Sequence, residues 1–314
     1  MILSALVILG SPLPSCDCFV VVKEAVEGLL HGRNPYSMVF TTVYEGVDLD
    51  YYSYLPASFL FTLPFRVFLF DVRWASVFSL IISALLLNKY VVNNERLSKY
   101  LFILILFSPR SFFIIEHMYL EPIIFMFFVL FLVFLKQEKR IFSALSLATA
   151  LNFKIHLWVF VFPIFIFLKT KKYQVFDFFF KTAIFIVLLL FPFILWDWRS
   201  FSKDIFFFIP GYSEVPSSTP IEKSLSTASI LRFLGFYEYK IISGIIFFVL
   251  YLFSIFYQKK KGLDISDYFA IVGLFLQFFL FLSFFNHYYL VYLFGVLALF
   301  NQLASLDLKK NRNL

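Results

Sequence analysis

"AIFIVLLLFPFIL", the stretch from Ala183 to Leu195, contains no charged residue and decides the fold class. Two further runs have the same character, "WASVFSLIISALLL" from Trp74 and "IIFMFFVLFLVFL" from Ile123. A membrane-spanning helix needs about 20 mainly apolar residues, and these runs approach that length. Of the 314 residues, 61% are hydrophobic and 15% are charged, whereas soluble domains have about 45–50% and about 25%. The sequence therefore predicts an integral membrane protein.

The apolar runs predict an all-α polytopic fold with about 9–11 hydrophobic segments. The net charge of +7 follows the membrane topology and does not indicate nucleic-acid binding, because no soluble domain offers a basic face. Short basic loops are expected on the cytoplasmic side. These loops contain the groups Lys89/Arg96/Lys99, Lys136/Lys139/Arg140, Lys169/Lys171/Lys172, Lys259/Lys260/Lys261 and Lys309/Lys310/Arg312.

We expect a single transmembrane domain over residues 1–314, with its long loops and its active site on the external or luminal face. Its predicted parts are a short or truncated first helix (1–14), an external loop with juxtamembrane helices (15–72), a helical core (73–196), a second external loop (197–240) and C-terminal helices (241–314). Any chemistry is then expected at the outer membrane face, built from loops and helix ends.

The segment from Ile141 to Leu168 does not fit a single span. It is about 28 residues long, it has Lys154 and His156 near its middle, and basic loops flank it at both ends. Two half-helices of about 13 residues would each reach about 20 Å. A broken hairpin that enters and leaves on one side therefore fits better than one helix.

Several motifs in order carry a family resemblance. "DCFVVVKEAVEGLLHGRNPY" from Asp17 and "YSYLP" from Tyr52 resemble the opening of GT-C superfamily glycosyltransferases, polytopic enzymes of the mannosyl- and arabinosyltransferase kind. "SPRSFFIIEHMYLEP" from Ser108, "LATALNFKIHLWVFVFPIFIF" from Leu147 and "FFNHYYLVYLFGVLAL" from Phe284 resemble later motifs of that family. The resemblance implies a polyprenyl-phosphate-linked sugar donor and a lipid-linked or glycan acceptor.

The resemblance matches Asp17 to the catalytic carboxylate of the family. Glycosyl transfer needs a base for the acceptor hydroxyl and groups that stabilise the departing phosphate. We assign Asp17 as the base and Glu121 as an assisting carboxylate or metal ligand, and expect the lipid phosphate to be neutralised by Lys154, His156 and His287. The other candidate substrate-binding residues are Arg33, Tyr36, Glu116, His117 and Tyr288.

Simpler explanations compete with these roles. A carboxylate near a membrane surface is often a solvated loop residue, and the histidines could be interfacial structural residues. Lys154 could also be structural, although an ionisable residue inside a membrane segment is a functional candidate by default. Asp48 and Asp50 suggest a D-x-D site for a divalent cation, but a solvated turn explains them as well. Cys16 and Cys18 are too close in sequence for an unstrained disulfide.

Two other classes of function stay open from the sequence. A multi-span transporter or lipid flippase also suits many apolar segments with a broken hairpin. Such a protein should carry ionisable residues near the midplane of several helices, whereas the acidic residues here gather at one predicted face. A non-catalytic assembly subunit would leave Asp17 and Glu121 dispensable.

Overall fold

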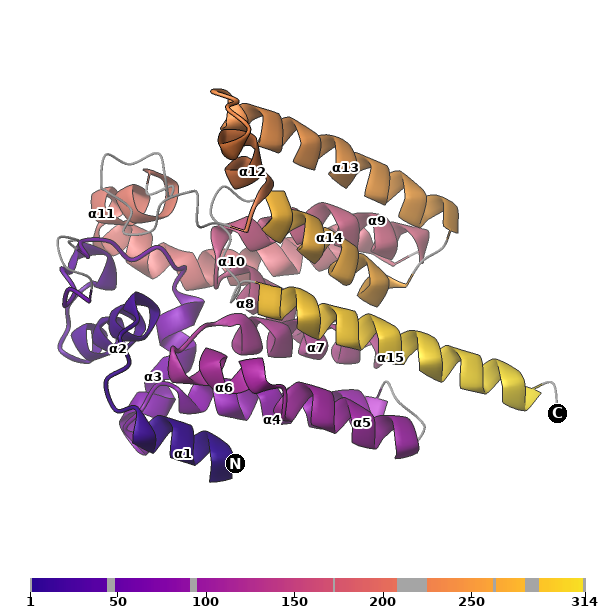
Figure 1. Ribbon diagram of the computed structural model, residues 1–314, viewed down its shortest axis with the longest axis horizontal. Helices are drawn as coiled ribbons and strands as arrows, with labels where there is room; N and C mark the ends of the chain where they lie inside the picture. Colours follow the sequence, from indigo (N-terminus) through magenta and orange to yellow (C-terminus); the bar gives the residue numbers. More distant parts are fainter. Residues whose placement is uncertain are drawn as a thin grey trace. The chain divides into compact units, whose positions relative to one another are not determined.

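The computed structural model (Figure 1) describes residues 2–43, 49–90, 95–171, 173–207, 225–261, 264–279 and 288–312. Within these ranges the regular structure is helical, and Phe40 and Leu49 form an isolated antiparallel bridge. The predicted all-α class is therefore confirmed for the described residues.

Two described helices are long and apolar enough to cross a membrane, α10 (Val175–Trp196) and the part of α13 (Tyr239–Lys261) that ends at Tyr257. Two pairs meet the same criterion when taken together, α3 (Ala57–Leu69) with α4 (Trp74–Tyr90) and α6 (Pro109–Glu116) with α7 (Glu121–Lys136). The pairs bend by 108° and 110° at their breaks. The described residues thus contain two to four candidate spans, and the larger predicted number stays a prediction.

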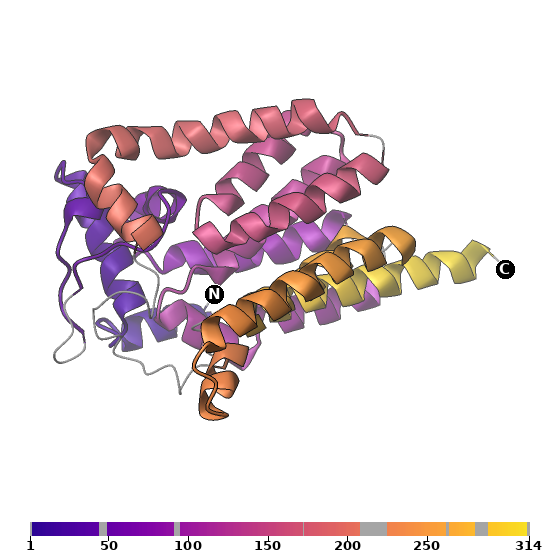
Figure 2. The same ribbon diagram turned by 90° about the horizontal axis from the view of Figure 1, so that it is seen from above.

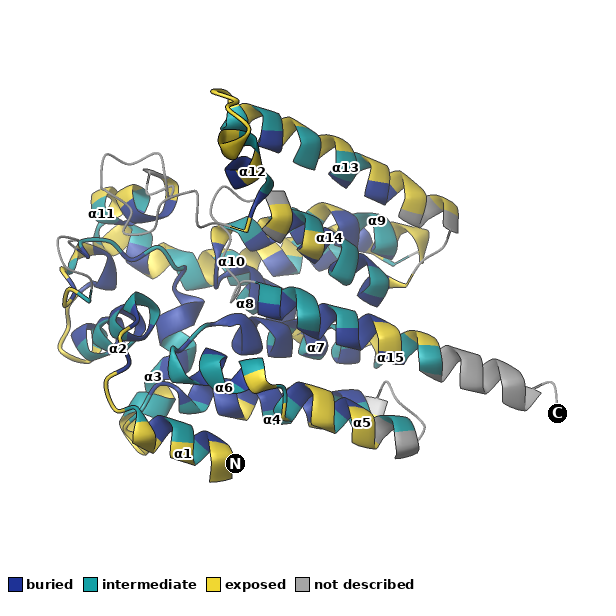
Figure 3. Ribbon diagram, in the orientation of Figure 1, coloured by how far each residue is buried: buried dark blue, intermediate teal, exposed yellow. Residues whose placement is uncertain are grey.

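The chain divides into two compact units. The first contains Met1–Ile81, Pro109–Trp158 and Phe178–Ser218. Its remaining elements are α1 (Ile2–Gly10), α2 (Asp17–Leu30), η1 (Pro35–Ser37), α8 (Arg140–Leu151), α11 (Trp198–Ser202) and η3 (Lys203–Phe207). In this unit α7 packs on α8, α2 packs on α3, and α1 packs on α6. Buried residues concentrate on α7 and α8, as the dark blue ribbon of Figure 3 shows.

The second unit contains Ile82–Ser108, Val159–Asp177 and Thr219–Leu314. Its elements include α5 (Glu95–Leu106), α9 (Val161–Thr170), α12 (Thr227–Phe233), α14 (Ile265–Phe279) and α15 (Tyr288–Arg312). Rings of Phe160, Phe269 and Phe294 meet at centroid distances of 5.4–5.7 Å. A Cβ atom on Gly273 would lie 3.3 Å from Phe294. The small residue therefore lets α14 and α15 approach closely.

The polar stretch "HGRNPY" ends α2 and reverses the chain. Gly32 has a φ of +72°, and the amide of Arg33 donates to the carbonyl of Gly28 at 2.8 Å, which closes the helix with a glycine in the left-handed region. The Asn34 side chain then accepts the amide of Tyr36 at 3.1 Å. Pro35 suits the first position of η1, since its nitrogen needs no partner there.

Arg73 fixes the approach to α2. Its guanidinium donates to the carbonyls of Ile8 and Ser11 at the end of α1, pairs with Asp71 at 2.6 Å, and lies 4.8 Å from the ring centre of Phe19. Unpaired carbonyls at a helix end need such a donor when they are buried. One buried cation therefore holds the end of α1 against the first turn of α2.

The turn between α6 and α7 uses a left-handed residue that is not glycine. Met118 has a φ of 57°, and the amide of Tyr119 donates to the carbonyl of Ile114 at 3.1 Å. A side chain in this region costs about 1 kcal/mol, which the buried surroundings of Met118 must offset. The turn directly follows Glu116 and His117, two of the predicted substrate-binding residues.

The segment from Ile141 to Leu168 is broken, as the sequence predicts. Helix α8 ends at Leu151, η2 covers Ile155–Phe160, and α9 begins at Val161. Lys154 lies in the break. The two ends of this segment belong to different compact units, so the predicted hairpin path and its sidedness stay predictions.

Candidate active site

Asp17 is the first residue of α2. Its Oδ1 atom accepts the backbone amide of Cys18 at 2.8 Å and the thiol of Cys16 at 3.6 Å. The first amides of a helix have no partner within the helix, and the helix dipole favours an anion at this end. Asp17 is only partly buried. The helix thus holds a carboxylate that solvent or a substrate can reach.

Two thiols flank this carboxylate. Cys16 is 2% exposed, Cys18 is partly exposed, and neither forms a disulfide. The interaction between the two thiols lowers the pKa of Cys16 and raises the pKa of Cys18, and burial raises the latter further. One ligand atom from each of Cys16, Asp17 and Cys18 lies within 4.8 Å of the others. Among the described residues, these three have the donor set and spacing to hold a metal ion.

Two tyrosines enclose the start of α2. The hydroxyl of Tyr54 donates to the Cys18 sulfur at 3.1 Å, and the Cys16 thiol donates to the Tyr119 hydroxyl at 3.8 Å. Burial raises the pKa of Tyr54 well above its ordinary value, and the neighbouring Cys18 and Asp17 raise it further. Tyr54 therefore stays a neutral hydrogen-bond donor beside the thiols.

A buried ion pair lies beyond Tyr54. Lys154 Nζ is 2.8 Å from Glu121 Oε1 and 5.5 Å from the ring centre of Tyr54. Glu121 is 3% exposed and Lys154 is 8% exposed. The second oxygen of Glu121, Oε2, is buried and has no hydrogen-bond partner among the described residues. The anionic partner expected for Lys154 is therefore a carboxylate of the protein itself, and a contact with a lipid phosphate stays a prediction.

Backbone hydrogen bonds hold the two sides of this site together. The amides of Leu55 and Ala57 donate to the carbonyls of Phe153 and Asn152 at 3.0 and 3.1 Å. Pro56 lies between these donors and has no amide proton of its own. The segment that carries Tyr54 is thus attached directly to the break that carries Lys154.

Tyr36 supports the site from inside the fold. It is 2% exposed, and its hydroxyl donates to the Tyr54 carbonyl at 2.9 Å. Its ring packs edge-on against Tyr52 and Phe201, at centroid distances of 5.7 and 4.8 Å. These contacts assign Tyr36 a packing role in this structure, and direct substrate contact by it stays untested.

Asp204, in η3 just after α11, binds the backbone of Tyr52, whose ring packs against Tyr36. The chain turns sharply after α10 (Figure 2), where Asp197 caps α11 by accepting the Ser200 amide at 3.1 Å. Asp204 Oδ2 then accepts the Tyr52 amide at 2.8 Å. Asp204 is 1% exposed, and burial raises its pKa to about 7.

This raised pKa predicts a pH-dependent stability. Between pH 3.8 and about 7 the folded protein keeps a proton on Asp204 that the unfolded chain has released, so stability falls as the pH rises through this range. We expect the unfolding temperature of the purified protein to decrease from about pH 5 to about pH 8, and Asp204→Asn to flatten this decrease.

Asp197→Asn is the control for this measurement. Hydrogen bonds from Ser200 lower the pKa of Asp197, so it titrates below the range tested. An Asp204→Asn protein with the wild-type pH slope would show that Asp204 does not cause the dependence.

The remaining predicted residues lie in different places. Arg33 is exposed. It lies between Gly32 and Asn34, which form the turn through a left-handed backbone and a side-chain hydrogen bond. Glu116 ends α6, and its Oε2 lies 3.9 Å from Nδ1 of His117. The His117 ring is tilted by 30° against the Phe113 ring, with centroids 4.1 Å apart. Glu116 and His117 are both partly exposed, on the same turn that leads to Tyr119.

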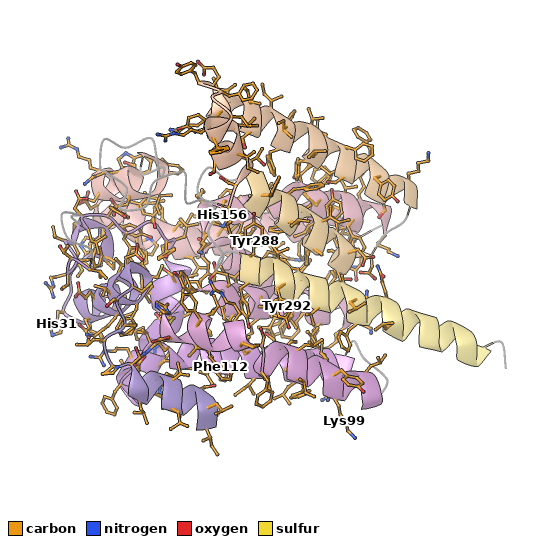
Figure 4. All side chains as sticks on the ribbon, in the orientation of Figure 1. His31, Lys99, Phe112, His156, Tyr288 and Tyr292 are labelled. Atoms are coloured by element: carbon orange, nitrogen blue, oxygen red, sulfur yellow. The ribbon has the colours of Figure 1, made fainter. Side chains whose placement is uncertain are left out.

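His31 and the predicted site residues His156 and Tyr288 are among the residues labelled in Figure 4. His31 projects outward at the end of α2 and is exposed. His156 is partly buried in η2, and Tyr288 begins α15 and donates to the Leu225 carbonyl at 2.6 Å. Tyr288 belongs to the second unit, so it is not placed relative to Asp17. His287 and Asp48 lie outside the described residues, and Asp50 pairs with Lys203 at 2.8 Å.

Cys16, Cys18, Tyr54 and Tyr119 were not predicted as site residues. The sequence offered a weak signal, since C-x-C encloses the very carboxylate that was singled out, and Tyr54 lies within "YSYLP". The structure brings these four side chains together with Asp17, and it brings Glu121 and Lys154 together beside Tyr54.

The sequence matches no protein-family model and no curated protein.

Proposed function

We propose that this protein is a membrane glycosyltransferase that moves a sugar from a polyprenyl-phosphate donor to a lipid-linked or glycan acceptor at the outer membrane face. One observation carries the proposal. Asp17 starts α2 as a partly exposed carboxylate, and Tyr54 contacts both its neighbour Cys18 and the buried Lys154.

The proposed step assigns a role to the free oxygen of Asp17. Oδ1 is engaged by the amide of Cys18, whereas Oδ2 has no hydrogen-bond partner among the described residues. An acceptor hydroxyl would lose its proton to Oδ2 as its oxygen bonds to the anomeric carbon of the sugar. The bond from that carbon to the donor phosphate breaks, and the phosphate leaves with the electron pair. General bases contribute about 10²- to 10⁴-fold in rate.

Glu121 and Lys154 would act on the donor side of the reaction. Lys154 is a buried cation next to Tyr54, and the unpaired Oε2 of Glu121 can accept a hydroxyl of the sugar. A donor phosphate that reaches Lys154 would have to share this cation with Glu121. A divalent cation could also help to neutralise the phosphate, and no cofactor is required by the proposed step.

Transfer of label tests this proposal against transport. Membranes that contain the protein are incubated with radiolabelled polyprenyl-phosphate sugars, and the lipid and glycan fractions are separated. We expect a new labelled product that membranes lacking the protein do not form. Label that stays on intact donor but crosses to the other leaflet would instead indicate a flippase and overturn the transferase proposal.

A further inference from the structure

The three consecutive residues Cys16, Asp17 and Cys18 form a donor set, of which the proposed transfer step uses only Oδ2 of Asp17. Their ligand atoms lie within 4.8 Å of one another. The chain has two cysteines in all, and both are in this group. Neither is used in a disulfide. Two sulfur donors and a carboxylate are thus concentrated at one helix end.

The local backbone explains how adjacent residues can face one point. Cys16 is the N-cap of α2 and has an extended conformation, with φ of −144° and ψ of 127°, while Asp17 and Cys18 are already helical. This change of backbone conformation between Cys16 and Asp17 lets their side chains and that of Cys18 converge. Oδ1 of Asp17 lies 3.6 Å from the Cys16 sulfur, so this oxygen is the carboxylate donor beside the thiols, and Oδ2 stays available for the transfer step.

We propose that Cys16, Asp17 and Cys18 bind a thiophilic divalent cation of the Zn²⁺ type. Tetrahedral Zn²⁺ takes sulfur ligands at about 2.3 Å and carboxylate oxygens at about 2.0–2.2 Å, which separates the donors by about 3.8 Å or less. Donor atoms that lie within 4.8 Å of one another must therefore approach by up to about 1 Å when the ion binds. Three protein ligands leave a fourth position open, as in catalytic zinc sites.

The chemistry of the ligands selects the cation. Thiolates favour Zn²⁺ and its soft analogues, whereas Mg²⁺ and Ca²⁺ prefer sites made of oxygen ligands. The partial exposure of Asp17 and Cys18 gives the ion a path from solvent. Binding would release the thiol protons to solvent. It would also place Tyr54 and Tyr119 as hydrogen-bonding neighbours of the two sulfur ligands.

Cadmium binding tests the site directly. The purified full-length protein, kept reduced, is titrated with Cd²⁺ while the ultraviolet charge-transfer absorption of cadmium–thiolate bonds is recorded. We expect a band that saturates near one Cd²⁺ per chain, is reversed by competing Zn²⁺ and resists excess Mg²⁺. Because the chain has no other cysteine, the band can arise only from this group.

Two variants separate this site from adventitious binding. Cys16→Ser/Cys18→Ser should lose the band, and Asp17→Asn should keep it with an affinity at least about tenfold weaker, because loss of supporting groups alone costs about 10–100-fold. Size-exclusion profiles confirm that both variants fold. Absence of a band in the wild type, or an unchanged affinity in Asp17→Asn, would overturn the proposed three-ligand site. Binding needs no sugar donor, so this result is independent of the proposed glycosyl transfer.

Discussion

Asp17→Asn is expected to lower the turnover of glycosyl transfer by at least about 100-fold, because the amide cannot accept the proton of the acceptor hydroxyl. The substitution is nearly isosteric, and the amide oxygen can still accept the Cys18 backbone amide that now bonds to Oδ1. Expression, folding and donor affinity should therefore stay close to those of the wild type. Initial rates with labelled donor and saturating acceptor measure the effect.

Glu24→Gln is the matched control. Glu24 is on the same helix, seven residues after Asp17, and accepts the Thr41 amide at 2.9 Å. We expect it to retain most of the activity. Near wild-type transfer by Asp17→Asn would show that Asp17 is not the base. Asp48, Asp50 and Glu121 would then be the next candidates for the base.

Lys154→Met should be strongly destabilising, because it leaves the Glu121 carboxylate buried without its cation. Removal of one partner from a buried ion pair costs about 3–5 kcal/mol, far more than loss of an exposed pair. The distance of 2.8 Å and the exposures of 3% and 8% place this pair in the buried class. Thermal unfolding in detergent measures the loss.

The double variant Glu121→Gln/Lys154→Met distinguishes the pair from a general packing defect. It removes both charges, so it should recover most of the stability lost in Lys154→Met. It should not recover transfer, since both groups also have proposed roles toward the donor. Equal instability of the single and double variants would show that the lysine side chain acts through packing and not through its charge.

The long helices could be predicted because their cause is local. The apolar run Ala183–Leu195 lies inside the observed Val175–Trp196, and the predicted C-terminal helices begin at residue 241, close to the observed start of α13 at Tyr239. The break in 141–168 was also visible, since Lys154 and His156 interrupt the apolar pattern. In contrast, the left-handed conformation of Met118 could not be predicted, because no glycine marks this turn. Packing around the buried side chain stabilises the conformation instead.

The site was only partly predictable because its contacts are not local. Asp17, Glu121 and Lys154 were each identified, but the Glu121–Lys154 pair joins residues 33 positions apart. A single sequence does not indicate which acidic residue pairs with which basic residue in the fold. For that reason the expected partner of Lys154 was a lipid phosphate. Likewise, Tyr119 reaches Cys16 across 103 positions, which no motif spacing could reveal.

The attachment of Leu55 and Ala57 to Phe153 and Asn152 has a consequence for how this protein can evolve. Its hydrogen bonds join main-chain atoms, so they tolerate any side chain at those four residues except proline at the two donors, Leu55 and Ala57. They do demand a fixed count of residues on each segment. One inserted residue beside Pro56 would slide Tyr54 along its partner by about 3.3 Å and separate it from Lys154. Selection should therefore act against insertions and deletions near Pro56 more strongly than against substitutions there.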